Sequence, residues 1–317
     1  MNMCVGVVAG GPLLVAAAAA KKEEEGHGHG RRRALKMVDR ELSNANFKSA
    51  LSLLKQLQRH PPPAGLSGFA AATQVPRRVS SVELLHLSVT QTSTLHSLFD
   101  AILYSINTSL QSSSSPLHEQ QQETCVTGDE HNDLYLQDDV IQHKQVAHHE
   151  AGHFLVGYLL GVLPKHYKFS CMEDKIADAN VKFLGFEFLT ELDDVVLSNK
   201  HLHEVKRGNR AKKRKLSNTV VSKFACVIVG GLVAEHLAFG YSKGHHGDVE
   251  KLDRVLKWLQ FTEGEANNLT RWAVLNTLTI LHRHTKARST LAEAMLDGRS
   301  IGYCIDVIET NLNHQNI

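Results

Sequence analysis

Cysteine is scarce in this chain of 317 residues, and its five copies are widely scattered. No two of them form a CxxC pair; they are Cys4, Cys125, Cys171, Cys226 and Cys304. Such spacing argues against a disulfide framework and favours free thiols in a reducing compartment. It also argues against a cysteine-based zinc site, so histidine and carboxylate side chains remain as the candidate metal ligands.

The chain also lacks a P-loop and a strong excess of one charge. No GxxxxGKS or GxxxxGKT motif occurs, so nothing in the sequence would cradle the phosphates of a nucleotide. The net charge is +2 at pH 7, which by itself does not indicate a nucleic-acid or membrane partner. What the sequence does contain is histidine, with 20 residues in an otherwise ordinary globular composition.

Residues 1–33 are predicted to be a targeting or disordered leader. Met1–Ala20 is uncharged and apolar, and about 20 such residues can span a bilayer, so a membrane anchor is an alternative. The run lacks a basic stretch at its start and is rich in Ala and Gly, which fits a secretory signal poorly. Residues 21–33 are charged and rich in Gly and His, as in a flexible lead-in.

A helical N-terminal region is predicted over residues 34–110. In residues 34–59, apolar side chains recur at helical spacing on both sides of a short polar turn. This part resembles one helical hairpin of the tetratricopeptide type, but no second copy follows, so we interpret it as a small packing hairpin. A second helical stretch covers residues 81–110, and the polar residues 111–135 predict a linker with a domain boundary near residue 135.

The main domain is predicted over residues 136–317, and its apolar pattern is mostly helical. The predicted fold class is therefore mainly α, with a short strand segment and a preceding helical N-terminal region. The expected elements are helices at 146–162, 217–239 (ended by Gly240), 248–260, 267–285 and 291–312, and one strand at 181–188.

An HExxH motif within residues 145–156, QVAHHEAGHFLV, carries the clearest chemical signal. Residues four apart share one face of a helix, so His149 and His153 can offer their imidazoles to one metal ion. Glu150 would then stand beside the metal as acid/base, while Zn²⁺ acidifies a water and polarises a carbonyl. The alternative is a solvated helix face that carries two histidines by chance, but the motif lies in an apolar helix, where such groups are costly without a purpose.

A third protein ligand is expected, because a catalytic zinc usually has three together with a water. Candidates lie within residues 244–250, GHHGDVE. Spacing alone does not choose among His245, His246, Asp248 and Glu250.

Three ordered segments resemble the peptidase domain of the FtsH-type zinc proteases. They are HHEAGHFLVGYLLG, VGGLVAEHLAFG at 229–240 and GHHGDVEKL at 244–252, and the resemblance covers about residues 140–312. It implies that Asp248 is the third zinc ligand beside His149 and His153. It also implies that the strand segment 181–188 borders the cleft and pairs with an extended substrate by strand addition.

The chain departs from that family in several places. The ATPase module that normally precedes the protease is missing, and Leu232, His236 and Gly247 replace the family's Arg, Glu and Asn. Glu235 persists, and we interpret it as a residue that supports the site or packs the helix. Plants have motor-less FtsH-like chains, commonly associated with plastids, and this sequence resembles them, which implies a chloroplast location.

The sequence thus predicts a zinc metalloendopeptidase that hydrolyses protein or peptide substrates without a motor of its own. A catalytically inactive scaffold, or a partner of complete FtsH-type complexes, is the alternative. A third hypothesis rests on residues 206–215, KRGNRAKKRK, which could act as a nuclear import signal, a nucleic-acid patch or a contact to anionic lipids. An exposed loop that binds nothing specific is the simpler interpretation of this cluster.

Overall fold

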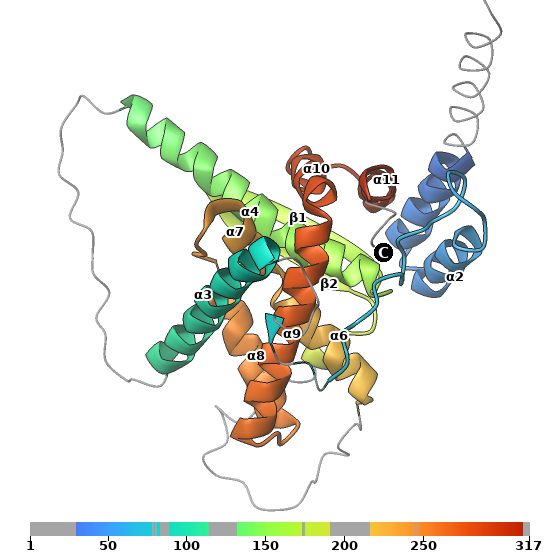
Figure 1. The fold of residues 1–317 in the computed structure, drawn as a ribbon. Helices are drawn as coiled ribbons and strands as arrows, with labels where there is room; N and C mark the ends of the chain where they lie inside the picture. Colours follow the sequence, from blue (N-terminus) through green and yellow to red (C-terminus); the bar gives the residue numbers. More distant parts are fainter. Residues whose placement is uncertain are drawn as a thin grey trace, which may run out of the picture. The chain divides into compact units, whose positions relative to one another are not determined.

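The computed structural model describes residues 30–77, 79, 81–82, 89–113, 132–172, 175–190, 216–244 and 246–312. These residues are mainly helical and form one two-stranded sheet, so the predicted fold class is confirmed at that level (Figure 1). The predicted leader up to residue 29, residues 114–131 of the polar linker and the basic cluster at 206–215 lie outside the described residues. The chain's contacts divide it into two units, Met1–Ser67 and Gly68–Ile317.

The first unit is the predicted helical hairpin. A helix over residues 30–43 is followed by a turn, in which Ala45 has a φ of 56°, and by α2 (Phe47–Leu57). The apolar side chains that recur at helical spacing in these two helices are buried, as expected of the apolar face of an amphipathic helix. The buried ones are Leu35, Val38, Leu42, Ala50, Leu54 and Leu57.

Helix α3 (Val89–Ser113) packs with the second unit, whereas the sequence prediction placed it ahead of a boundary near residue 135. It packs against α7, α8 and α9. Two hydroxyls one helical turn apart contribute to this packing. Ser105 Oγ lies 3.2 Å from His236 Nε2, and Ser109 Oγ lies 2.7 Å from His246 Nδ1.

Helix α4 (Asn132–Leu159) is the helix around which the second unit packs, and it is the long green helix of Figure 1. It begins earlier than the predicted residue 146. The sheet and helices α6, α7, α9 and α10 all pack against it, because its second half is apolar on nearly every side. The helix is followed by a turn at Gly161, whose φ of 74° suits glycine.

The predicted apolar helix 217–239 is present as two helices, α6 (Asn218–Ile228) and α7 (Gly230–Phe239). They are interrupted at Val229, and α7 ends at Gly240 as predicted, with a φ of 81°. By length and composition the stretch Asn218–Phe239 could cross a membrane, yet 83% of its apolar window is buried inside the fold, as in a core helix.

The strand prediction is correct only in part. Strands β1 (Pro164–Met172) and β2 (Lys175–Phe183) form an antiparallel hairpin, and β1 was not predicted. The strand predicted at 181–188 is wrong beyond Phe183, because the chain turns at Gly185, which has a φ of 95°. The apolar residues after this turn, Phe186 and Phe188, are buried in the core and not on one face of a strand.

Four helices complete the second unit: α8 (His246–Trp258), α9 (Glu263–Arg283), α10 (Thr285–Leu296) and α11 (Ile301–Asn311). A capping box between Thr262 and Glu265 begins α9. The single helix predicted at 291–312 is two helices. They are separated at Gly298, whose φ is 65°, and α11 begins after the N-cap Ser300.

Candidate metal centre

Helices α4 and α7 approach closely because both carry glycine where they meet. A β-carbon on Gly152 of α4 would lie 2.3 Å from the carbonyl oxygen of Gly230 and 2.6 Å from Cβ of Ala234 on α7. Gly152 immediately precedes His153 in the HExxH motif. The close approach therefore sets the motif directly against α7 and the end of α6.

His149, Glu150 and His153 form a buried group able to hold a metal ion. Their possible ligand atoms lie within 4.8 Å of one another. The imidazole rings of His149 and His153 lie edge to face with ring centroids 4.7 Å apart, at a spacing that residues one helical turn apart allow. Their two Nε2 atoms are separated by 3.0 Å.

The carboxylate of Asp248, in the first turn of α8, lies beside the Nε2 atoms of both histidines. Its Oδ2 atom lies 2.9 Å from Nε2 of His149 and 2.9 Å from Nε2 of His153. Ligands held tetrahedrally at about 2.0–2.1 Å from zinc lie about 3.3 Å from one another. The three atoms are thus arranged as a zinc site requires, and slightly more tightly, so the donor set fits the ion.

The Nδ1 atom of each imidazole has a partner of its own, and this orients the Nε2 atom of each ring toward Asp248. His149 Nδ1 lies 2.5 Å from Oε1 of Glu235 on α7, and His153 Nδ1 donates to the carbonyl oxygen of Val227 at 2.7 Å. Such partners fix the tautomer and the ring orientation of metal-binding histidines. Glu235 therefore supports the site, one of the two roles inferred for it from the sequence.

Glu235 is itself held in place by other donors. Its Oε2 atom accepts hydrogen bonds from Nε2 of Gln145 at 2.7 Å and from the backbone nitrogen of Lys243 at 2.8 Å. Sequence reasoning missed Gln145, although it lies four residues before His149 and so on the same helical face.

Glu150 is the buried carboxyl group beside these ligands. Its side chain is buried, and its Oε2 atom has no hydrogen-bond partner. Burial raises the pKa of Glu150 above its usual range. A buried carboxyl oxygen without a hydrogen-bond partner is unfavourable for folding, which favours a chemical role over a packing role for this residue.

The acid–base pattern of the site follows from its charges. Burial would raise the pKa of Asp248, but the charge of His153 and hydrogen bonds from both histidines hold it well below its usual range. Burial would lower the pKa of His149, but its hydrogen bonds to Asp248 and Glu235 raise it to about 10. Protons and a metal ion therefore compete for the same nitrogen atoms.

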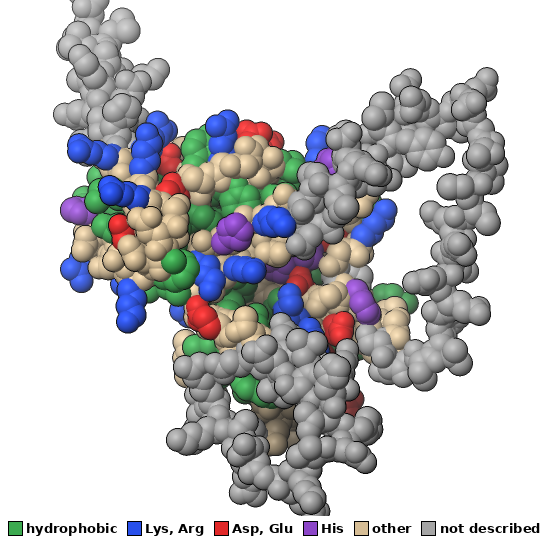
Figure 2. All heavy atoms as spheres, turned by 180° about the vertical axis from the view of Figure 1, so that it is seen from behind, with side chains coloured by type: hydrophobic (Ala, Val, Ile, Leu, Met, Phe, Trp, Pro, Cys, Tyr) green, Lys and Arg blue, Asp and Glu red, His purple; other side chains and the backbone are tan. Residues whose placement is uncertain are grey.

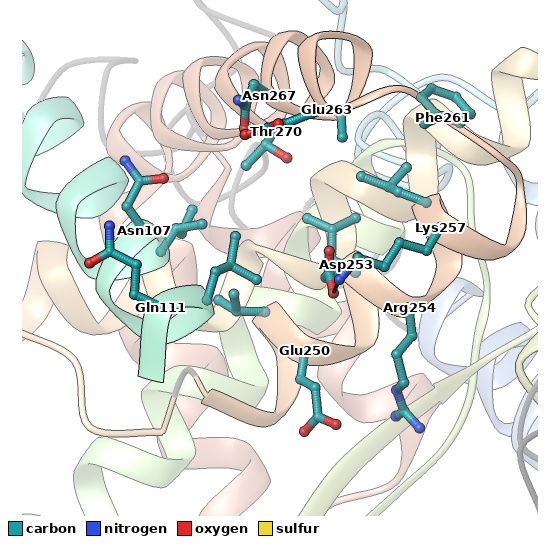
Figure 3. Close-up of a pocket in the computed structure, with 16 residues that line it drawn as sticks. Asn107, Gln111, Glu250, Asp253, Arg254, Lys257, Phe261, Glu263, Asn267 and Thr270 are labelled. Atoms are coloured by element: carbon teal, nitrogen blue, oxygen red, sulfur yellow. Dashed lines mark ion pairs between the residues drawn. The ribbon is translucent and has the colours of Figure 1, made fainter. Parts of the chain in front are cut away.

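Two of the other candidate third ligands, His246 and Glu250, make contacts elsewhere. His246 directs Nδ1 to Ser109 of α3, and His245 lies outside the described residues. Glu250 is exposed and lines a separate cavity of about 680 Å³ between α3, α8 and α9 (Figure 3). The structure thus brings together the four residues expected from the sequence: His149, Glu150, His153 and Asp248.

Charged side chains of both signs are exposed on the described residues that Figure 2 draws. On this face Lys and Arg side chains are the more prominent, and Asp, Glu and His side chains lie scattered among them. The net charge of the whole sequence, +2 at pH 7, is near neutral.

Comparison with known proteins adds no relative: the chain matches no protein-family model, no curated protein and no solved structure.

Proposed function

We propose that this protein is a zinc-dependent metalloendopeptidase that hydrolyses peptide bonds in protein substrates. The observation that carries the proposal is the convergence of His149 Nε2, His153 Nε2 and Asp248 Oδ2, with mutual distances of 2.9–3.0 Å. Glu150 lies beside them as a buried carboxyl group with an unpaired oxygen. The combination of a three-residue ligand set and an adjacent acid/base is what metal-assisted hydrolysis requires.

Two histidines and one carboxylate also serve as ligands of non-haem iron in oxygenases. The position of Glu150 favours hydrolysis, because Glu150 directly follows His149 in an HExxH motif while Asp248 offers a third ligand atom. The raised pKa of Glu150 brings it closer to neutral pH, where an acid/base catalyst works best.

In the proposed mechanism, each residue has one task. Bound zinc would supply Lewis acidity toward the scissile carbonyl and lower the pKa of a water. Glu150 takes a proton from the attacking water and returns it to the leaving amine. Glu235 and the carbonyl of Val227 hold the imidazoles of the ligands in orientation.

The substrate would lie along β2. Residues Ala179–Val181 and Phe183 of this strand line a cleft that also contains Glu150 and His153. An extended peptide beside β2 would therefore pass the candidate metal centre, as strand addition requires. Without a P-loop the chain would act on unfolded substrates, or with FtsH-type ATPase subunits as partners. We place it in the plastid on the resemblance to motor-less FtsH-like chains; a membrane-associated or nuclear location is the alternative.

An inactive scaffold is the second candidate function. It is favoured by the absence of a P-loop from the sequence. His236, which replaces a family glutamate, lies 3.2 Å from Ser105 of α3. This contact gives His236 a packing role, so the replacement does not disturb the ligand set.

Cleavage of unfolded casein by the zinc-supplied full chain tests the proposal. We expect Glu150→Gln to keep the metal and to lose at least about 100-fold in rate, the scale of general acid–base catalysis. Glu293→Gln, an exposed carboxylate on α10, is the matched control and should retain full activity. A wild type that binds zinc and leaves casein intact would support the scaffold.

A further inference from the structure

Arg288, near the start of α10, carries a guanidinium group that is buried inside the second unit. The residue is only 2% exposed, and its Nε and Nη1 atoms have no hydrogen-bond partner. Burial lowers the pKa of Arg288 to about 10, which still leaves the group protonated at neutral pH. The interior of the second unit therefore holds a positive charge that the proposed hydrolysis does not use.

No carboxylate in the described part of the chain compensates this charge. Burial lowers the pKa of Arg288, and no neighbouring negative charge raises it again. The buried carboxyl group of Glu309 lies on α11, which packs against α10, but it accepts hydrogen bonds from the hydroxyl of Tyr158 and the backbone nitrogen of Gly68. The counter-charge of Arg288 is thus not among these side chains.

Two histidines lie within reach of the Arg288 charge, and they add nitrogen atoms to the same region. For His148 of α4 and His282 of α9, burial is the main cause of a lowered pKa, and the charge of Arg288 lowers it further. The Nδ1 atom of His148 is also buried without a hydrogen-bond partner. Three helices that pack together, α4, α9 and α10, therefore direct basic groups toward one another (Figure 1).

The direction of the Arg288 side chain agrees with this arrangement. Side chains of an α-helix tilt toward its N-terminus, so Arg288 extends toward the junction of α9 with α10. His282 belongs to the last turn of α9, directly before that junction.

A buried charge is strongly unfavourable unless a counter-charge and hydrogen bonds accompany it. An anion beside Nε and Nη1 would supply both, because guanidinium nitrogens donate strong hydrogen bonds to charged acceptors. The anion would have to leave its water at a residue that is only 2% exposed. Since the cost of this step rises steeply with ionic charge, a small monovalent anion is favoured over phosphate or sulfate.

We propose that Arg288 forms the core of a binding site for a small monovalent anion, such as chloride, where α4, α9 and α10 meet. The bound anion would neutralise the guanidinium group and stabilise the packing of α10 against α4. The proposal does not depend on the peptidase function, because none of its groups belongs to the ligand set of the candidate metal centre.

Thermal unfolding of the full chain, followed by circular dichroism, tests the site. Sodium chloride is varied between about 1 and about 300 mM, and sodium gluconate keeps the sodium concentration constant, because gluconate is too large to replace chloride at a buried group. A ligand that binds only the folded state raises the melting temperature with its concentration. For a site that fills over this range, we expect the melting temperature of wild type to rise by about 3 °C or more.

Arg288→Met provides the decisive variant, since it removes the charge and keeps an unbranched side chain of similar length. It should lose the rise with chloride, and at low chloride it should melt no lower than wild type, because an uncompensated buried charge has been removed. Arg283→Met, at an exposed arginine of α9, is the matched control and should keep the full rise. Should Arg288→Met fail to fold, Arg288→Lys keeps the charge without the guanidinium donors and should show a smaller rise.

A melting temperature of wild type that does not respond to chloride would overturn the site. An equal rise in wild type and Arg288→Met, or in wild type and Arg288→Lys, would overturn it as well. Chloride bound to zinc would give this second result, because the metal ligands are intact in every variant. Loss of the rise in Arg283→Met would likewise contradict the assignment to Arg288.

Discussion

Gly231 of α7 lies against the imidazole of His149, so that a β-carbon on Gly231 would be 2.3 Å from His149 Nε2. Real β-carbons do not approach another heavy atom this closely. The glycine therefore provides the space in which the metal-facing nitrogen of His149 is held.

Gly231→Ala should displace His149 and abolish metal binding. The expected loss in zinc affinity is at least about 100-fold, because the new methyl group and the ligand nitrogen cannot occupy the same space. Gly264→Ala on α9, where a β-carbon would meet nothing within 4 Å, is the control and should bind zinc like wild type. Competition with a zinc-binding dye measures both affinities; equal affinity in the two variants would refute the close contact.

Glu235→Gln should weaken zinc binding while preserving the shape of the side chain. It removes the negative charge that Glu235 presents to His149 Nδ1, and outer partners of this kind contribute about 10–100-fold in metal affinity. The same dye competition applies, with the exposed Glu263→Gln as control. An unchanged affinity would show that Glu235 only packs α7.

Three variants separate the candidate third ligands. Asp248→Ala should remove stable zinc binding, because Asp248, of the candidates that the structure describes, lies 2.9 Å from Nε2 of both imidazoles. His246→Ala and Glu250→Ala should retain the metal. The side chain of His246 contacts Ser109, and that of Glu250 lines the separate cavity. If Glu250→Ala loses the metal while Asp248→Ala retains it, Glu250 and not Asp248 would be the third ligand.

Ionisation of the Cys226 thiol should make the free energy of unfolding depend on pH in the alkaline range. Burial raises the pKa of this thiol to about 12, above the value of about 9 expected in the unfolded chain. The folded state thus holds the proton more tightly, and the contribution is complete below about pH 9 and is lost as the pH rises toward about 12.

In this window the unfolding free energy of wild type should fall by about 1.4 kcal/mol per pH unit more than that of Cys226→Ala. Urea unfolding at about pH 8 and about pH 10 measures the difference. Parallel pH dependence in the two proteins would show that the thiol ionises without unfolding.

Local sequence spacing was sufficient to predict the central part of the candidate site. His149 and His153 share a helical face whatever the rest of the chain does, and Gly240 ends α7 as predicted. Asp248 is 99 residues from His149, so spacing could not select it over His246 or Glu250, and only the resemblance to a family favoured it. Its position depends on how α8 packs in the second unit.

The errors in the fold prediction have different causes. In β1, the apolar residues Tyr167, Phe169 and Cys171 alternate with polar ones, so the sequence carried a strand signal that the prediction missed. The placement of α3 depends on distant side-chain contacts, such as Ser109 with His246, which composition does not reveal. Composition suggested instead a linker at the polar residues 111–135 and a domain boundary near residue 135.

The central claim is that His149, His153 and Asp248 hold one zinc ion, and metal analysis of the purified full chain tests it most directly. Inductively coupled plasma mass spectrometry should find about one zinc per wild-type chain and none when His149 and His153 are both changed to Ala. Wild type without bound metal, iron in place of zinc, or a double variant that keeps its zinc would contradict the account.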